Sequence, residues 1–271
     1  MDNITFTGKE FNEIYKNVIF YKFLRDDLKH FDYTYKNGLN IDPVPFYPFG
    51  KCQAGGMYFC EEMRSPIYIG CYGKYYSTVT IPDDAFVCVE NYKFKANKIY
   101  LDEIKEIGSI ENVKFWELVL SIYPQHLDLI HPSNPVYEKM CECAIKNNGF
   151  VLRKIGKNVT DPELYFKLCE ISVKQSPEYI IYVSKNMMSD EQYKQICRII
   201  VETHSTGLRF IDQTHELCKF AVQKFGCAIN YVKVQTPELC KLAVLQNEHA
   251  LVYIKDQQTY NEMHNLIYGL N

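Results

Sequence analysis

Five cysteines in the second half of the chain recur at one position of a repeated segment: Cys141, Cys169, Cys197, Cys218 and Cys240. Cysteine thiolates bind zinc, so this set is first tested as a metal site. The intervals are 28, 28, 21 and 22 residues, whereas structural zinc sites pair their cysteines about two to four residues apart. If the repeated segments stack one after another, their thiols would also lie along the stack rather than around one ion. The pattern therefore predicts small, buried core residues.

Other candidate metal ligands and nucleophiles are scattered. The seven histidines show no H-E-x-x-H or other paired-ligand spacing, and they are His30, His126, His131, His204, His215, His249 and His264. Cys52 and Cys60 flank the Gly55-Gly56 turn, where a reactive thiol would need a histidine and an acid at a readable spacing. Neither is present, so two structural cysteines are predicted, with no metal and no cofactor.

A group of tyrosines is the other chemically suggestive feature. Tyr68, Tyr72, Tyr75 and Tyr76 stand close together beside Lys74. Such a group could stack nucleic-acid bases or form the centre of a protein contact. The alternative is the rim of a half-buried hairpin, which needs no ligand at all.

The cysteine positions belong to modules of about sixteen residues. Each module has apolar residues at helical spacing, then a polar or glycine-containing break, then a second apolar run. The six modules begin at Phe115, Met140, Leu168, Ile196, Leu217 and Leu239. Since one module cannot bury its apolar face alone, the period predicts a stacked, solenoid-like array. The stretch 259–271, with Met263 at the cysteine position, is expected to cap it.

Residues 1–110 differ from the array in being rich in tyrosine, proline and glycine. We predict an α+β head domain here, followed by an all-α helical repeat domain over residues 111–271. Within the head, a helix is expected from Lys9 to about His30. Strands are expected at 57–59, 76–81, 85–89 and 98–101. The linker is placed near residues 107–109.

Composition limits the function classes. The chain has 271 residues, of which 47% are hydrophobic, and a formal net charge of −3. A net acidic chain has no overall attraction to nucleic acid or to an anionic membrane. The first residues are polar and acidic rather than basic and then apolar, and no apolar run is long enough to span a bilayer. These features predict a soluble protein that stays in a cytosol.

Two stretches of the head carry a resemblance to known proteins. They are GLNIDPVPFYPFGKCQAGGMYFCEE at 38–62 and VTIPDDAFVCVENYKFKANKIYL at 79–101. They resemble the amino-terminal domain that precedes ankyrin repeats in proteins of giant amoebal viruses of the mimivirus group. The C-terminal modules look like a short helical repeat, without assigned function, carried by the same viruses. The resemblance implies a giant-virus protein in which a common head is joined to a repeat array. Such a protein is expected in the host cytoplasm, the viral factory or the virion.

A more distant resemblance implies an enzyme. Gly38-Leu39-Asn40-Ile41, then Gly50-Lys51 and Gly56-Met57-Tyr58-Phe59, look like the NAD-binding segment of ADP-ribosyltransferases of the poly-ADP-ribose polymerase type. Tyr58 would match the aromatic residue at the nicotinamide, with Gly56 beside it. His30 is nearest to the histidine of that family, but it stands closer than its pattern allows. The catalytic glutamate position falls on Ala85, which cannot stabilise positive charge, and Glu90 would point to the opposite strand face.

The sequence therefore predicts a non-enzymatic adaptor that binds a host or viral protein through the surface of its repeats. Two alternatives remain. One is a degenerate ADP-ribosyltransferase-like head that still binds NAD or ADP-ribose. The other is a nucleic-acid-binding repeat protein, although the net acidity and the absence of regularly spaced base-reading residues count against it.

Overall fold

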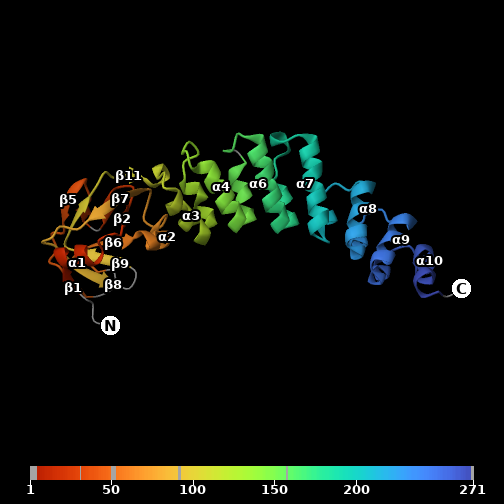
Figure 1. Cartoon of the computed structure of the whole chain (residues 1–271), viewed down its shortest axis with the longest axis horizontal. Helices are drawn as coiled ribbons and strands as arrows, with labels where there is room; N and C mark the ends of the chain where they lie inside the picture. Colours follow the sequence, from red (N-terminus) through yellow and green to blue (C-terminus); the bar gives the residue numbers. More distant parts are fainter. Residues whose placement is uncertain (1–4, 31, 50–52, 91–92, 157, 270–271) are drawn as a thin grey trace. The chain divides into compact units, whose positions relative to one another are not determined.

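The computed structural model describes residues 5–30, 32–49, 53–90, 93–156 and 158–269. The chain divides into two compact units, residues 1–143 and 144–271. In the described residues the strands all lie in the first unit and the second unit is helical, which confirms the predicted order of an α+β region followed by helices (Figure 1). The predicted boundary near residue 110 stays a prediction. The first predicted module belongs to the same compact unit as the strands.

The first unit is built on one antiparallel sheet. Among the described residues, nine strands join it in the order β1-β8-β9-β6-β2-β7-β10-β5, with β11 also pairing β7. A separate hairpin is formed by β3 and β4. The strands are β1 Thr5–Thr7, β2 Phe20–Leu24, β3 Lys29–His30, β4 Tyr33–Thr34, β5 Gly38–Ile41, β6 Met57–Glu61, β7 Tyr75–Thr80, β8 Phe86–Glu90, β9 Lys93–Ala96, β10 Lys98–Leu101 and β11 Lys105–Glu106.

One face of this sheet holds an aromatic core. Phe11 of α1 (Gly8–Ile14) is fully buried and its ring packs against Phe20, Phe59 and Phe94. The helix begins at a capping box in which Thr7 and Glu10 bond each other's backbone N–H. This cap satisfies two of the free donors at the helix start. Thus α1 closes the core from one side of the sheet.

The predicted helix from Lys9 to about His30 is wrong. The helix ends at Ile14, and Phe20–Leu24 form β2 at the centre of the sheet, between β6 and β7. Two apolar residues that would lie on the buried side of such a helix are exposed instead, since Ile14 is 58% exposed and Ile19 is 46% exposed. The aromatic-rich segment of β2 is paired on both edges, and this pairing stabilises a strand more than the weak helical pattern of the segment stabilises a helix. The four strands predicted from the sequence are confirmed as β6, β7, β8 and β10.

On the opposite face of the sheet lies α3 (Val113–Ile122), and α2 (Ser65–Tyr68) packs against α3. The ring of Tyr21 in β2 lies 5.5 Å from that of Phe115, which opens the first predicted module. Trp116, at the cysteine position of that module, is fully buried and donates its indole N–H to the carbonyl of Ile110 at 2.8 Å. The first module therefore shares its packing with the sheet.

Each predicted module coincides with an α-helix followed by a short 3-10 helix. From the second module onward the α-helices are α4 Tyr137–Asn147, α6 Pro162–Gln175, α7 Asp190–Thr203, α8 His215–Lys224 and α9 Pro237–Gln246, with α10 Gln257–Tyr268 after them. The first module has η3 Pro124–Leu129 after α3, and the later 3-10 helices include η5 Pro177–Tyr182, η7 Gly207–Arg209, η8 Gly226–Tyr231 and η9 Glu248–Tyr253. A short α5, Leu152–Ile155, follows η4, Gly149–Val151. Asp161, Ser189 and Thr236 cap three of these helices, because their side chains accept backbone N–H bonds at the helix starts.

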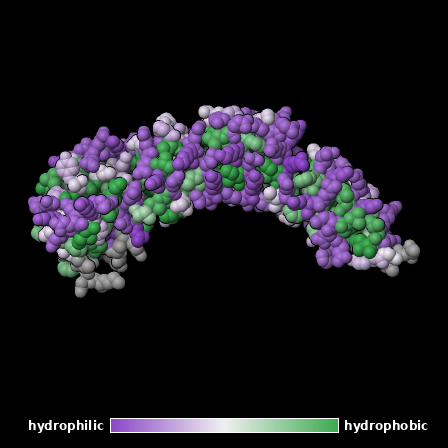
Figure 2. All heavy atoms as spheres, in the orientation of Figure 1, coloured by the Kyte–Doolittle hydropathy of each residue, from purple (hydrophilic) through white to green (hydrophobic). Residues whose placement is uncertain are grey.

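In the second unit each helix packs on the next one along the chain, from α6 through α10 (Figure 1). The 3-10 helices η7, η8 and η9 likewise pack on one another, so the helices and the 3-10 segments form two adjacent rows. Met263 of α10 is buried, as its place in the repeat predicts. The visible face of the helical region is mostly hydrophilic, with a hydrophobic patch near its C-terminal end (Figure 2). No helix in the described parts of the chain is long and apolar enough to cross a bilayer.

Candidate functional site

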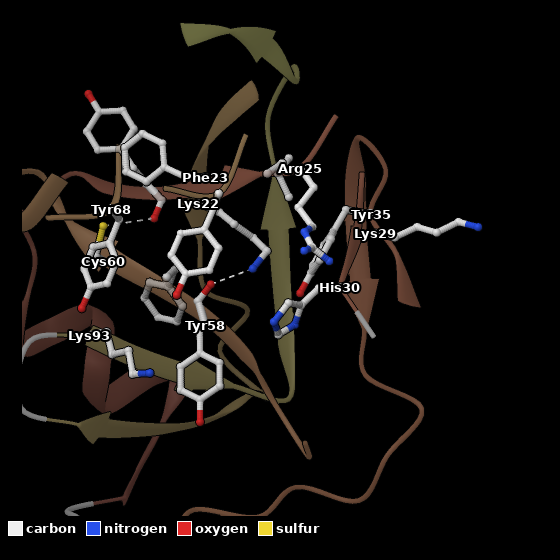
Figure 3. A pocket seen from close by; sticks show the side chains of 14 residues that line it. Lys22, Phe23, Arg25, Lys29, His30, Tyr35, Tyr58, Cys60, Tyr68 and Lys93 are labelled. Carbon is white, nitrogen blue, oxygen red and sulfur yellow. Dashed lines mark hydrogen bonds between the residues drawn. The ribbon is translucent and has the colours of Figure 1, made fainter. Parts of the chain in front are cut away.

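A cavity of about 100 Å³ opens in the first unit where two central strands part (Figure 3). Strands β2 and β6 pair only at Phe20 with Glu61 and at Tyr21 with Cys60. Beyond these two pairs, β2 stays paired with β7 on its other edge and β6 stays paired with β9 on its other edge, so β2 and β6 diverge. The lining residues are Tyr21, Lys22, Phe23, Leu24, Arg25, Lys29, His30, Tyr35, Tyr58, Phe59, Cys60, Tyr68, Tyr72 and Lys93.

Lys22 bridges the point where the strands separate. Its side chain is buried, with 6% exposed, and Nζ donates a 2.8 Å hydrogen bond to the backbone carbonyl of Tyr58 in β6. The same ammonium lies 4.2 Å from the ring centre of Tyr35, a distance at which a cation is attracted to the π-face. Burial lowers the pKa of Lys22 to about 7, because the charged form loses its hydration. Where β2 and β6 separate, the Lys22 ammonium is thus the hydrogen-bond donor to a backbone carbonyl of β6.

Tyr58, the aromatic residue singled out by sequence, lines this cavity. Its hydroxyl donates to a carboxylate oxygen of Glu90 at 3.2 Å, and Lys93 Nζ stands 4.0 Å from its ring centre. Glu90 and Lys93 also lie 3.8 Å apart as an ion pair. The ring is therefore held between a carboxylate and a cation contributed by β8 and β9.

His30 reaches the same cavity from the β3–β4 hairpin. Burial lowers its pKa, and the positive charges of Lys22 and Arg25 lower it further. Figure 3 shows Lys22, Arg25 and His30 converging on one side of the cavity, whereas Lys29 extends away from it. At neutral pH these lowered pKa values leave Lys22 only partly protonated and favour the neutral form of His30, beside the guanidinium cation of Arg25.

The other positions named by the ADP-ribosyltransferase resemblance lie elsewhere. Ala85 is buried in the aromatic core with Met57 and Phe59, on the sheet face opposite to the one that Tyr58 occupies. Glu90 is on the side of Tyr58, as its phase along the strand predicts. Tyr58 and Ala85 therefore do not face a common cleft. The alternative of NAD or ADP-ribose binding and the prediction of a non-enzymatic protein both stay predictions that the geometry does not test.

Gly56 has a backbone role. Its φ is +138°, and an added Cβ would lie 2.6 Å from Cγ of the fully buried Lys95. Its N–H donates to Asp42 at 2.6 Å, and Lys95 Nζ donates to the carbonyl of Tyr47 at 2.7 Å. Only glycine accommodates both the backbone angle and the lysine stem. Gly50, Lys51 and Cys52, also named from the sequence, lie outside the described residues.

The tyrosine group divides between two environments. Tyr68 and Tyr72 line the cavity with their ring centres 6.3 Å apart. Tyr75 and Tyr76 are in β7 and pair with Leu24 and Phe23. Half of the group thus belongs to the central sheet and half to the cavity wall.

The repeated cysteines are core residues, as predicted. All five are buried. Burial raises the pKa of Cys141 and of Cys169 to about 12, and it also raises the pKa values of Cys197, Cys218 and Cys240. In the described residues no cluster of three or more possible metal ligands is found. Such thiols carry almost no thiolate at neutral pH and are correspondingly unreactive.

Glutamines between the modules form contacts that the sequence reading missed. Gln213 donates to the carbonyls of Leu208 and Tyr231 and accepts the N–H of Lys233, at 2.8–2.9 Å. One module later, Gln235 makes the same three contacts with Ile229, Tyr253 and Lys255. The sequence feature that could have revealed these contacts is the Gln-Thr pair that recurs immediately before α8 and α9. Each glutamine ties the end of one 3-10 helix to the end of the next.

The comparisons with known proteins give one relative. The chain is 31% identical over 96 residues to Putative ankyrin repeat protein R229 of Acanthamoeba polyphaga mimivirus. The match covers 32% of this chain and spans 31% of the length of that protein. No protein-family model and no solved structure matches. The match supports the predicted origin in a giant virus of the mimivirus group.

Proposed function

We propose that the chain is a non-enzymatic interaction protein whose helical modules, stacked as a solenoid, bind a host or viral protein. The proposal rests on the division of the 3-10 helices into buried positions that keep an aliphatic residue and exposed positions whose residues differ. It places the protein in the cytoplasm or the viral factory of an infected host cell. No chemistry on the partner is involved, so the interaction itself is the function.

The observation that carries the proposal is a row of exposed positions in the 3-10 helices. In η5, η8 and η9 the fourth residue is buried and aliphatic in every case, as Ile180, Ile229 and Leu251. The fifth residue is exposed and differs in every case, as Ile181, Asn230 and Val252. Because the buried fourth residues pack independently of the exposed fifth residues, the fifth residues can vary to fit a partner without disturbing the core.

Two members of this row expose large apolar side chains. Ile181 and Val252 are each 71% exposed. Apolar side chains placed at equivalent positions on one side of an array suit the dry centre of a protein contact. The mimivirus relative is named for ankyrin repeats, a class of repeat that builds extended binding surfaces. Its name supports a binding role here.

The test is affinity purification of the tagged full-length protein from infected amoebae, with nuclease-treated lysate and quantitative mass spectrometry. We expect a stoichiometric partner that survives nuclease treatment. The double variant Ile181→Asp/Val252→Asp should retain at least tenfold less of it, because two carboxylates would be desolvated in the contact. The direct measurement is then the Kd of the purified partner for both proteins.

Ile14→Asp is the matched control, since Ile14 is an exposed isoleucine of the first unit. It should retain the partner like the wild type. Equal retention by the double variant would exclude this row as the binding surface. Recovery of partners only from lysate that keeps its nucleic acid would instead favour the nucleic-acid-binding alternative.

A further inference from the structure

The lining of the cavity in the first unit is unbalanced in charge. It includes Lys22, Arg25, Lys29 and Lys93 together with His30, and none of its described residues is an aspartate or a glutamate. Of the carboxylates close to this lining, Glu90 accepts from Tyr58 and pairs with Lys93, and Asp42 accepts the N–H of Gly56. Among the contacts of the described residues, neither Lys22 nor Arg25 has a carboxylate partner, and cations placed in this way in a concave site raise the local concentration of anions.

The positive groups are also positioned rather than scattered. Lys22 is fixed by the carbonyl of Tyr58 and the ring of Tyr35. Arg25 follows β2 and His30 belongs to the β3–β4 hairpin, and both turn toward Lys22 (Figure 3). An ammonium, a guanidinium and an imidazole thus converge from two separate elements on one small volume. Convergent donors of this kind suit the several oxygens of one oxyanion.

Burial of Lys22 adds an energetic reason for an anion at this place. An ammonium offers three N–H donors, and one carbonyl of the described residues accepts from it within hydrogen-bond distance. A buried charge is costly unless an opposite charge or further hydrogen bonds compensate for it. An oxyanion between Lys22 and Arg25 would supply both. The cavity would then be stabilised by its ligand.

The remaining wall is aromatic. Tyr21, Tyr58, Tyr68 and Tyr72 contribute ring surface, as does Phe59. The volume of about 100 Å³ is below the roughly 150 Å³ of a protein cavity that encloses one benzene ring, so a ring carried by the anion would be only partly enclosed. A dinucleotide is far larger than this space. The walls therefore favour a single ring over an extended ligand.

We infer that this cavity binds a phosphate-class oxyanion, with its oxygens against Lys22, Arg25 and His30, and that it prefers one carried on a single aromatic ring. This ligand site is independent of the partner surface on the modules. The inference assigns binding only, and no bond is made or broken. Inorganic phosphate and an organic phosphomonoester share the recognised group and differ in the ring.

The experiment is isothermal titration of the full-length protein at 0.15 M salt with phenyl phosphate, inorganic phosphate, phenol and NAD. We expect phenyl phosphate to bind at least fivefold tighter than phosphate, and phenol to show no binding. Phosphate binding as tightly as phenyl phosphate would overturn the preference for a ring. Phenol binding as tightly as phenyl phosphate, or NAD binding where phenyl phosphate does not, would overturn the assignment of an oxyanion site.

Two exposed residues supply matched variants. Arg25→Gln removes a cation that points into the cavity and should weaken phenyl phosphate about tenfold. Lys29→Gln removes the same charge from a side chain that points away, and should change the affinity less than twofold at this salt concentration. Equal losses in the two variants would show a long-range charge effect and no built site. Lys22→Met should abolish binding, with circular dichroism confirming that the variant is folded.

Discussion

At the scale of single residues, Lys22 is the most unusual feature of the molecule. It stands in the middle of a central strand, among aromatic neighbours, and its ammonium is buried. Lysine is rarely fully buried unless it is paired. Here a backbone carbonyl and an aromatic ring take the place of a carboxylate. Such an arrangement tolerates the neutral amine as well as the ammonium.

The pKa of Lys22 leads to a prediction about stability. Because burial lowers it to about 7 from the ordinary value of 10.5, the unfolded chain binds a proton between these two values that the folded chain does not. Stability from this group therefore rises with pH over that window, by up to about 1.4 kcal/mol for each pH unit. The free energy of unfolding of the wild type minus that of Lys22→Met should increase from pH 7 to pH 9.

Urea unfolding of both proteins at several pH values gives this difference directly. Lys29→Met controls for the loss of one positive charge at an exposed position of the same cavity. A difference that stays constant from pH 7 to pH 9 would show that Lys22 keeps its proton throughout. The pH dependence expected for a buried amine would then be absent.

Gly56 allows a second prediction at this scale. Gly56→Ala would place a methyl group 2.6 Å from the stem of Lys95 and force a side chain into a φ of +138°. The expected loss is about 2–5 kcal/mol, from backbone strain and overpacking together. Gly38→Ala is the control, because its φ is +87° but nothing lies within 4 Å of the added carbon. It should lose only about 1–2 kcal/mol, and equal losses in urea unfolding would contradict the steric argument.

At the scale of elements, the modules are joined by polar as well as apolar contacts. Gln235→Ala would remove three hydrogen bonds, to the carbonyls of Ile229 and Tyr253 and from the N–H of Lys255. We expect a loss of about 1–3 kcal/mol from the three bonds together, of which the one to Ile229 is partly buried. Hydrogen exchange should report faster opening of η8 and η9.

Gln258→Ala is the matched control for that experiment. Gln258 bonds only to the side chain of Glu262 one turn later in α10 among the described contacts, and both residues are exposed. Its removal should change the free energy of unfolding by less than about 0.5 kcal/mol. Equal losses in the free energy of unfolding would show that the Gln235 contacts stabilise the array no more than an exposed surface contact does.

These elements also show what the sequence could reveal. The modules were predictable because their signals are local: Thr236 caps a helix and Cys240 and Ala243 follow at helical spacing. Alternation likewise revealed β6 and β10. The strand β2 was missed because its structure depends on β6 and β7, which are more than thirty residues away in the chain.

The cavity was predictable only in part. Tyr58 and His30 were named from a resemblance, and they do line one cavity. Lys22 and Arg25 were not, because the stretch that contains them reads locally as a helix. Their role follows from the separation of β2 from β6, a tertiary feature with no local signal. The glutamine contacts were missed for a similar reason, since Gln213 bonds to residues of two different modules.

At the scale of the whole molecule, the two proposals concern different compact units. The cavity lies within residues 1–143, and Ile181 and Val252 lie within residues 144–271. Substitutions at distant sites that share no partners are additive in free energy. The oxyanion and the protein partner should therefore bind independently, unless one of them shifts a conformational equilibrium that both units share.

The prediction is that each set of substitutions affects one activity only. Arg25→Gln should weaken phenyl phosphate about tenfold and leave the Kd of the partner within twofold of the wild type. Ile181→Asp/Val252→Asp should do the reverse, and the triple variant should show both losses unchanged in size. Titration of each ligand in the presence of a saturating amount of the other is the decisive measurement. A change of more than about fivefold, equivalent to roughly 1 kcal/mol of coupling, would contradict independence and show that the oxyanion regulates the interaction.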